Sequence, residues 1–125
     1  MTIYLTMEDI LALHEQQIER FGGASGVRDQ GLVQAALLRP QTGYYSDVIE
    51  EASALWESLT MNHGFVDGNK RIGFAATYVF LRLNDIVIEA DANEPARFIL
   101  ENLEAGTMSR SVMEDWLRAH TNTSN

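Results

Sequence analysis

Residues 63–71 are HGFVDGNKR and combine an imidazole, a carboxylate, two glycines, an amide and two cations within nine positions. Apolar side chains recur every three or four positions on both sides of this stretch, over about residues 47–62 and 69–83. This spacing predicts two amphipathic helices, with the residues between them forming a loop. The second helix, from Asn69 to Leu83, is apolar nearly all round, which predicts a buried central helix.

Capping residues and periodicity predict four more helices, over about residues 7–21, 29–38, 93–104 and 109–120. The first has Thr6 as its N-cap, and its apolar face includes His14, which we interpret as a hydrogen-bonded core histidine rather than a ligand. The second begins at Asp29 and is stopped by Pro40. His120 is expected to be a surface cap. The sequence therefore predicts an all-α fold.

A short β-branched run at residues 86–88 is expected to pair with residues 3–5, which would give one very short β pair. The length of 125 residues fits one domain, over residues 1–120, followed by a polar and frayed tail over residues 121–125.

The composition restricts the classes of partner. A formal net charge of −9 argues against a nucleic-acid-binding surface, because such binding depends on many lysines and arginines. The chain has no cysteine, no apolar run long enough to span a bilayer and no signal-peptide pattern at its start, so a cytoplasmic protein is expected. Its single lysine, Lys70, lies beside Arg71 at the start of a predicted helix. Two cations there invite an anion, because the start of a helix is already electropositive.

His63 continues the apolar stripe of the helix over residues 47–62, so we expect its ring to point inward, with Gly64 as the C-terminal cap. Two interpretations stay open: a histidine that merely caps the helix, or a general base with a pKa near neutrality. A second open choice concerns the loop 41–47. Its Tyr44 and Tyr45 either cover the edge of the core or belong to a flap that docks a partner.

The same nine residues have the groups needed to hold a polyphosphate. Free amides near Gly68, Asn69 and Lys70 would form an anion hole, and Lys70 and Arg71 would add charged contacts. Asp67 is placed to bind Mg²⁺ carried by a nucleotide, and His63 could remove a proton from an attacking hydroxyl. The alternative for residues 67–69 is a plain turn with an asparagine N-cap.

HGFVDGNKR resembles the signature of the Fic/Doc (Fido) superfamily, H-x-F-x-[D/E]-[G/A]-N-[G/K]-R, and its lysine variant is typical of the death-on-curing (Doc) branch. The runs LALHEQQIERFGGASGVRDQGLVQAALLRPQ and NKRIGFAATYVFLRLND also resemble Doc-type proteins. This resemblance implies the compact all-α Fido fold. It also implies a toxin of a type II toxin–antitoxin pair, with an antitoxin whose disordered C-terminal segment covers the site.

The resemblance assigns roles to single residues. It makes His63 the base, Asp67 the acid associated with Mg²⁺, Asn69 a phosphate or metal contact, and Lys70 and Arg71 phosphate ligands, with Gly68 at the nucleotide. It also implies that a flap ahead of the histidine helix, here Thr42, Gly43, Tyr44 and Tyr45, docks the target.

Lysine in place of the glycine of AMP-transferring relatives implies a protein kinase that moves the γ-phosphate of ATP to a threonine of translation elongation factor Tu. The longer AMP-transfer motif has a second arginine where this chain has Phe74, and some Doc-type relatives have asparagine where this chain has Ala75. Two alternatives remain: a Fic-type AMP transferase, and a catalytically degenerate Fido domain that acts as a binding module with its antitoxin.

Overall fold

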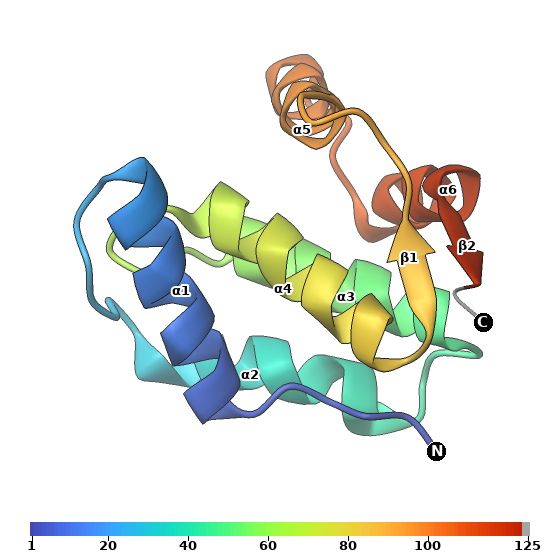
Figure 1. Cartoon of the computed structure of the whole chain (residues 1–125), viewed down its shortest axis with the longest axis horizontal. Helices are drawn as coiled ribbons and strands as arrows, with labels where there is room; N and C mark the ends of the chain where they lie inside the picture. Colours follow the sequence, from blue (N-terminus) through green and yellow to red (C-terminus); the bar gives the residue numbers. More distant parts are fainter. Residues whose placement is uncertain (124–125) are drawn as a thin grey trace.

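The computed structural model describes residues 1–123, and this part of the chain has six α-helices, one 3-10 helix and two short strands (Figure 1). In chain order they are α1 (Met7–Phe21), α2 (Gln30–Leu38), η1 (Arg39–Thr42), α3 (Val48–Met61), α4 (Asn69–Leu83), β1 (Ile86–Ile88), α5 (Glu94–Ala105), α6 (Arg110–His120) and β2 (Thr121–Thr123). Within these residues, no helix is long and apolar enough to cross a lipid bilayer. The predicted helical fold with one very short β pair is confirmed.

Helix α4 is the centre of the molecule, where it contacts α1, α3, α5 and β1 (Figure 1). Its closest partner is α3, and the two helices approach tightly because Gly73 has no side chain. A Cβ atom at Gly73 would lie 3.3 Å from Cδ1 of Trp56 and would collide with the hydroxyl of Thr60. The prediction that residues 69–83 form the central buried helix is confirmed. The chain nevertheless leaves Tyr78 and Leu83 of α4 exposed.

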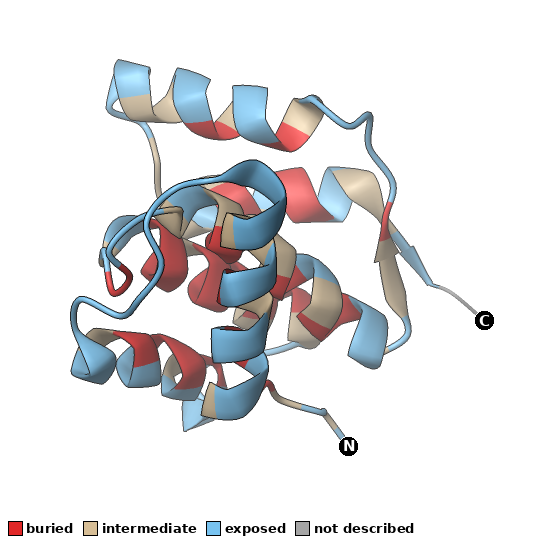
Figure 2. Cartoon of the chain, turned by 60° about the vertical axis from the view of Figure 1, so that its left-hand side comes forward, coloured by how far each residue is buried: buried red, intermediate tan, exposed pale blue. Residues whose placement is uncertain are grey.

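Helices α1 and α2 pack on this pair, α1 against α4 and α2 against α3. The start of α1 is a capping box, in which the Thr6 hydroxyl accepts from the Asp9 amide at 3.1 Å and the Asp9 carboxylate accepts from the Thr6 amide at 2.9 Å. Asp29 caps α2 by accepting from the Leu32 amide at 3.1 Å. Ile10 and His14, four positions apart, are the buried residues of α1, whereas the face of the helix turned to the viewer in Figure 2 is mostly exposed.

Helices α5 and α6 join the core through an aromatic cluster. The rings of Trp56, Phe98 and Trp116 lie with their centroids 5.5–5.7 Å apart, so α3, α5 and α6 meet at one point. The expectation that His120, at the end of α6, is a surface cap is wrong. Its ring stacks on Trp116 at 4.0 Å, and its Nε2 lies 3.0 Å from a carboxylate oxygen of Glu94 at the start of α5.

The strand pairing differs from the prediction. β1 pairs antiparallel with β2, with Ile86 opposite Thr123 and Ile88 opposite Thr121. The predicted partner, residues 3–5, instead meets the end of α4: the Asn84 side chain accepts from the Ile3 amide at 2.8 Å and donates to the Ile3 carbonyl at 2.9 Å. One amide side chain thus satisfies the backbone groups that a neighbouring strand would have used. The predicted frayed tail is therefore wrong for residues 121–123, and residues 124–125 lie outside the described part.

Candidate functional site

The loop between α3 and α4 begins with a left-handed residue, His63, whose φ is +53°. The structure contradicts the predicted inward position: α3 ends at Met61 with Asn62 as its C-cap, and His63 is exposed. Gly64 does not take the left-handed cap either, because it is pressed against α2. A Cβ atom there would lie 2.7 Å from Cγ2 of Val33. The turn therefore falls one residue earlier, on a histidine, a residue type that tolerates this conformation better than most.

Phe65 anchors the loop in the core. Its side chain is 1% exposed and stacks on His14 with a centroid distance of 3.9 Å. The Asn69 side chain closes the loop on both sides of Phe65, accepting from its amide and donating to its carbonyl, each at 3.1 Å. His14 Nε2 contacts the Asp67 carbonyl at 2.8 Å, and it is the donor because a carbonyl can only accept. The prediction of a hydrogen-bonded core histidine at position 14 is confirmed.

The glycine-rich loop after α1, residues 22–29, lies along the other side of the same loop. Val27 forms a β-bridge with Phe65, and the Val66 amide donates to the Gly26 carbonyl at 3.1 Å. Three glycines, Gly22, Gly23 and Gly26, shape this loop, and all have positive φ, between 86° and 110°. Their spacing matches no common nucleotide-binding pattern, so only the fold reveals what they approach.

Asp67 and Arg71 connect the site to this glycine-rich loop. The Asp67 carboxylate accepts from the Ala24 amide at 3.2 Å and from the Gly68 amide at 2.8 Å. These two backbone hydrogen bonds hold the pKa of Asp67 below its usual value, so it is charged at neutral pH. The Arg71 guanidinium donates to the Gly22 carbonyl at 3.1 Å.

Helix α4 starts with free amides next to these charges. Its N-cap is Gly68, which has a φ of +74° and no side chain to satisfy the first-turn N–H groups. The first turn contains no acidic residue, and Lys70 within it is exposed. Free amides, a positive helix end and two cations are an arrangement that binds phosphate. His63 is exposed as well, so these groups lie on an open surface and not in the interior toward which the His63 ring was predicted to point.

The residues at this site fit a magnesium ion that arrives with a nucleotide. Among residues 1–123, no group of three or more acidic or histidine side chains is arranged to hold a metal by itself. Mg²⁺ on a nucleotide needs only one or two protein carboxylates besides the phosphates, and Asp67 is exposed and charged here. Asn69, the other predicted metal contact, already uses both side-chain groups on Phe65.

The residues of the predicted substrate flap lie at the other end of α3 from His63. Tyr44 and Tyr45 precede α3, whereas His63 follows it, and the 14 residues of α3 separate the two ends by about 21 Å (Figure 1). Tyr45 packs beside Arg39, whose Nε donates to the Tyr45 hydroxyl at 2.8 Å, and beside Arg110 of α6. Thr42, Gly43 and the exposed Tyr44 belong to the same end. The predicted helix over residues 47–62 already places the loop 41–47 and His63 at opposite ends, so the assignment of the flap rested on the family resemblance.

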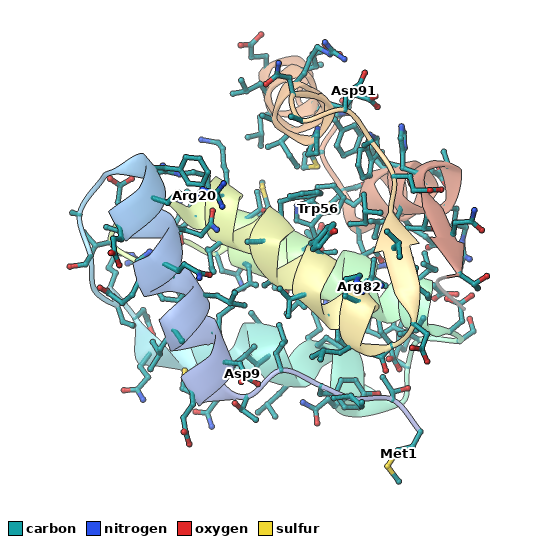
Figure 3. All side chains as sticks on the ribbon, viewed as in Figure 1. Met1, Asp9, Arg20, Trp56, Arg82 and Asp91 are labelled. Carbon is teal, nitrogen blue, oxygen red and sulfur yellow. The ribbon has the colours of Figure 1, made fainter. Side chains whose placement is uncertain are left out.

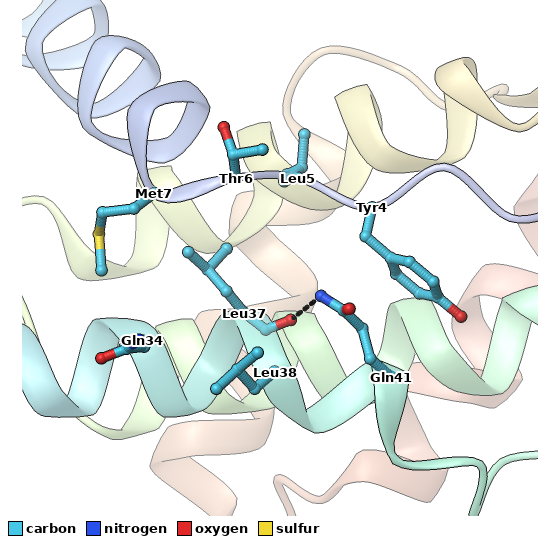
Figure 4. Close-up of a pocket in the computed structure, with 8 residues that line it drawn as sticks. All are labelled: Tyr4, Leu5, Thr6, Met7, Gln34, Leu37, Leu38 and Gln41. Atoms are coloured by element: carbon cyan, nitrogen blue, oxygen red, sulfur yellow. Dashed lines mark hydrogen bonds between the residues drawn. The ribbon is translucent and has the colours of Figure 1, made fainter.

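A surface groove lies between the N-terminal segment and α2, lined by residues 4–7, 34, 37, 38 and 41 (Figure 4). None of residues 63–71 lines it. The 63–71 loop is therefore not part of this groove.

Comparison with known proteins identifies the family whose signature the 63–71 loop resembles. Residues 4–81 match the sequence profile of the Fic/DOC family. The chain is 43% identical over 96 residues to a protein named "Toxin Doc" from Mycolicibacterium smegmatis (strain ATCC 700084 / mc(2)155), an alignment that covers 73% of this chain and 72% of that protein. It is 29% identical over 119 residues to "Protein kinase doc" from Escherichia phage P1, covering 92% and 93% of the two chains.

Proposed function

Because this chain belongs to the Fic/DOC family, we propose that it is the toxin of a type II toxin–antitoxin system and acts as an ATP-dependent protein kinase. The names of the two relatives support this proposal, since one is called a toxin and the other a protein kinase. The observation that carries it is the uncapped start of α4, where free amides and Lys70 lie beside the charged Asp67. The reaction belongs in the cytoplasm, where ATP and the translation machinery are found.

In the proposed reaction, His63 accepts the proton of a threonine hydroxyl on elongation factor Tu while the hydroxyl oxygen attacks the γ-phosphorus of ATP. The bond from that phosphorus to the bridging oxygen breaks, and ADP leaves. The first-turn amides of α4, with Lys70 and Arg71, neutralise the phosphate charge. Bound Mg²⁺ supplies further charge neutralisation through Asp67. Asn69 acts by holding the loop in shape, because its side chain is hydrogen-bonded to the Phe65 backbone.

The glycine-rich loop 22–29 takes the place of residues 42–45 as the segment that meets the target. It is exposed throughout, and it already runs along Phe65 and Val66. A cognate antitoxin with a disordered C-terminal segment would silence the toxin by covering this surface.

AMP transfer is the alternative reaction at the same site. It would need room for the α-phosphate in the anion hole, and the exposed side chain of Lys70 stands at that helix end instead of a glycine. The place of the second motif arginine is taken by Phe74, whose ring packs against Trp56 in the aromatic cluster at a centroid distance of 5.7 Å. These two features favour γ-phosphate transfer over AMP transfer.

The proposal is tested by incubating the protein with elongation factor Tu, Mg²⁺ and ATP labelled at either the α- or the γ-phosphate. Label retained only from the γ position is expected, and label from the α position would replace the kinase by an AMP transferase. His63→Ala should abolish transfer, whereas His120→Ala, the same substitution at the far end of the molecule, should not. No transfer from either label would favour a binding module that acts with its antitoxin.

A further inference from the structure

Arg28 lies directly behind the histidine of the candidate site, although no part of the motif includes it. Its Nε donates to the His63 carbonyl at 2.6 Å, and its Nη2 reaches the Asn62 carbonyl at 3.4 Å. These carbonyls are at the C-terminal end of α3, where the helix leaves acceptors without intrahelical partners and carries partial negative charge. A guanidinium is the side chain best suited to satisfy two such acceptors at once.

The backbone around Arg28 fixes the next peptide as well. The amides of Arg28 and Asp29 both donate to the Gly64 carbonyl at 2.9 Å. Asp29 is itself held at the start of α2, because its side chain accepts from the Leu32 amide. The His63 and Gly64 carbonyls are therefore both held by Arg28 and Asp29, the last two residues before α2, and Asp29 is the N-cap of that helix.

The conformation held in this way is one that a histidine does not prefer. His63 has a φ of +53°, in the left-handed region that non-glycine residues occupy only when their surroundings impose it. The Asn69 and Phe65 hydrogen bonds restrain the loop on the far side of Gly64, so the contacts made by Arg28 are the ones that act on His63 itself.

We propose that Arg28 is a positioning residue for the proposed base: it holds the His63 carbonyl, and with it the left-handed backbone from which the imidazole projects. This inference rests on the proposed function for its kinetic consequence. The positioning itself concerns only the backbone of His63.

The test compares Arg28→Ala, Arg28→Lys and a matched control, Arg82→Ala. Arg82 is an exposed arginine in the last turn of α4, at the opposite end of that helix from Gly68 (Figure 3). Arg28→Ala should lower kcat about 100-fold with the KM for ATP unchanged, since a small displacement of a reacting group has an effect of that size. Arg28→Lys should recover part of the loss, and Arg82→Ala should match the natural chain.

Backbone ¹³C chemical shifts of His63 give a second measurement, because they report its φ and ψ without any turnover. They should move in Arg28→Ala and stay in place in Arg82→Ala. Unchanged shifts and unchanged kcat in Arg28→Ala would overturn the inference, as would a kcat loss that only follows the fraction of unfolded protein. If Arg28→Ala does not fold, Arg28→Met, which keeps most of the aliphatic stem and removes every donor, takes its place with the same expectations.

Failure of the proposed function gives a different result from failure of this inference. A natural chain that transfers no phosphate would remove the kinase proposal. The His63 shifts of the Arg28 variants would still show whether Arg28 sets the conformation of that residue.

Discussion

Replacing Gly64 by alanine should destabilise the protein because of crowding and not because of backbone strain. The φ of Gly64 is outside the positive range, so alanine can adopt the same backbone. A Cβ atom, however, would lie 2.7 Å from Cγ2 of Val33 and 3.3 Å from the Val33 amide nitrogen. Val33 is 1% exposed on α2 and has no free space into which to move. Overpacking of this kind costs about 1–3 kcal/mol.

A second substitution isolates this contact. Val33→Ala alone should cost about 2 kcal/mol, because it leaves a small cavity in a buried site. In the double variant Gly64→Ala/Val33→Ala, the added methyl group occupies part of the space that Cγ2 has vacated. The double variant should therefore lose about 1–2 kcal/mol less stability than the sum of the losses of the two single variants. Such a coupling is expected of residues in direct contact.

Urea unfolding monitored by tryptophan fluorescence would measure these free energies, and thermal unfolding would show a shift of about 4 °C per kcal/mol. Gly31→Ala is the matched control. Gly31 is exposed within α2, and a Cβ atom there would meet one atom, the Asp29 carboxylate oxygen at 3.3 Å, so this change should alter the free energy of unfolding by less than about 1 kcal/mol in either direction. Strictly additive costs for Gly64 and Val33, or a Gly64→Ala variant as stable as the natural chain, would refute the reasoning.

Three further predictions test other contacts. Asn69→Ala removes two hydrogen bonds from the backbone of the loop and should cost about 1–3 kcal/mol in urea unfolding; a neutral result would show that the loop keeps its shape without them. The hydrogen bond from Arg110 holds the pKa of Glu114 in the folded protein below its ordinary value. The unfolded chain therefore binds more protons at this residue. Glu114 stabilises the fold above the unfolded pKa, and this contribution is lost as the pH falls through the folded pKa. Glu114→Gln should therefore weaken the loss of stability between about pH 5 and pH 3, and an unchanged acid limb would contradict this. Tyr45→Phe removes the acceptor of the Arg39 Nε–H and should cost about 1 kcal/mol while leaving phosphate transfer unchanged; a loss of transfer would support a role for the loop 41–47.

Local rules predicted the helices well because each helix is specified by residues close to its ends. The capping box of Thr6 and Asp9 and the N-cap at Asp29 act within three residues of one another. The apolar periods of α3 and α4 likewise require no knowledge of the rest of the chain, and their alternation predicted the central position of α4. The chemistry-bearing groups of the 63–71 loop could be identified for the same reason.

The errors concern contacts between distant segments. Gly64 is crowded by Val33, which is 31 residues earlier in the chain, and the His63 carbonyl accepts from Arg28, which is 35 residues earlier. β1 pairs with residues 121–123 because the Asn84 side chain occupies the backbone of residue 3. No local sequence pattern shows which distant residues will be in contact. The contacts of the glycine-rich loop with Phe65 and Val66 were missed for the same reason.

Both described ends of the chain are fastened at one pole of the molecule. Residue 3 is bonded to Asn84, and residues 121–123 pair with β1, which directly follows Asn84 (Figure 1). The 15 residues of α4 keep this pole about 22 Å from Gly68. An affinity tag, a fluorophore or a surface linker placed next to residue 1 would therefore stand clear of the loop that carries His63. Immobilised protein could present that loop freely to a partner in solution.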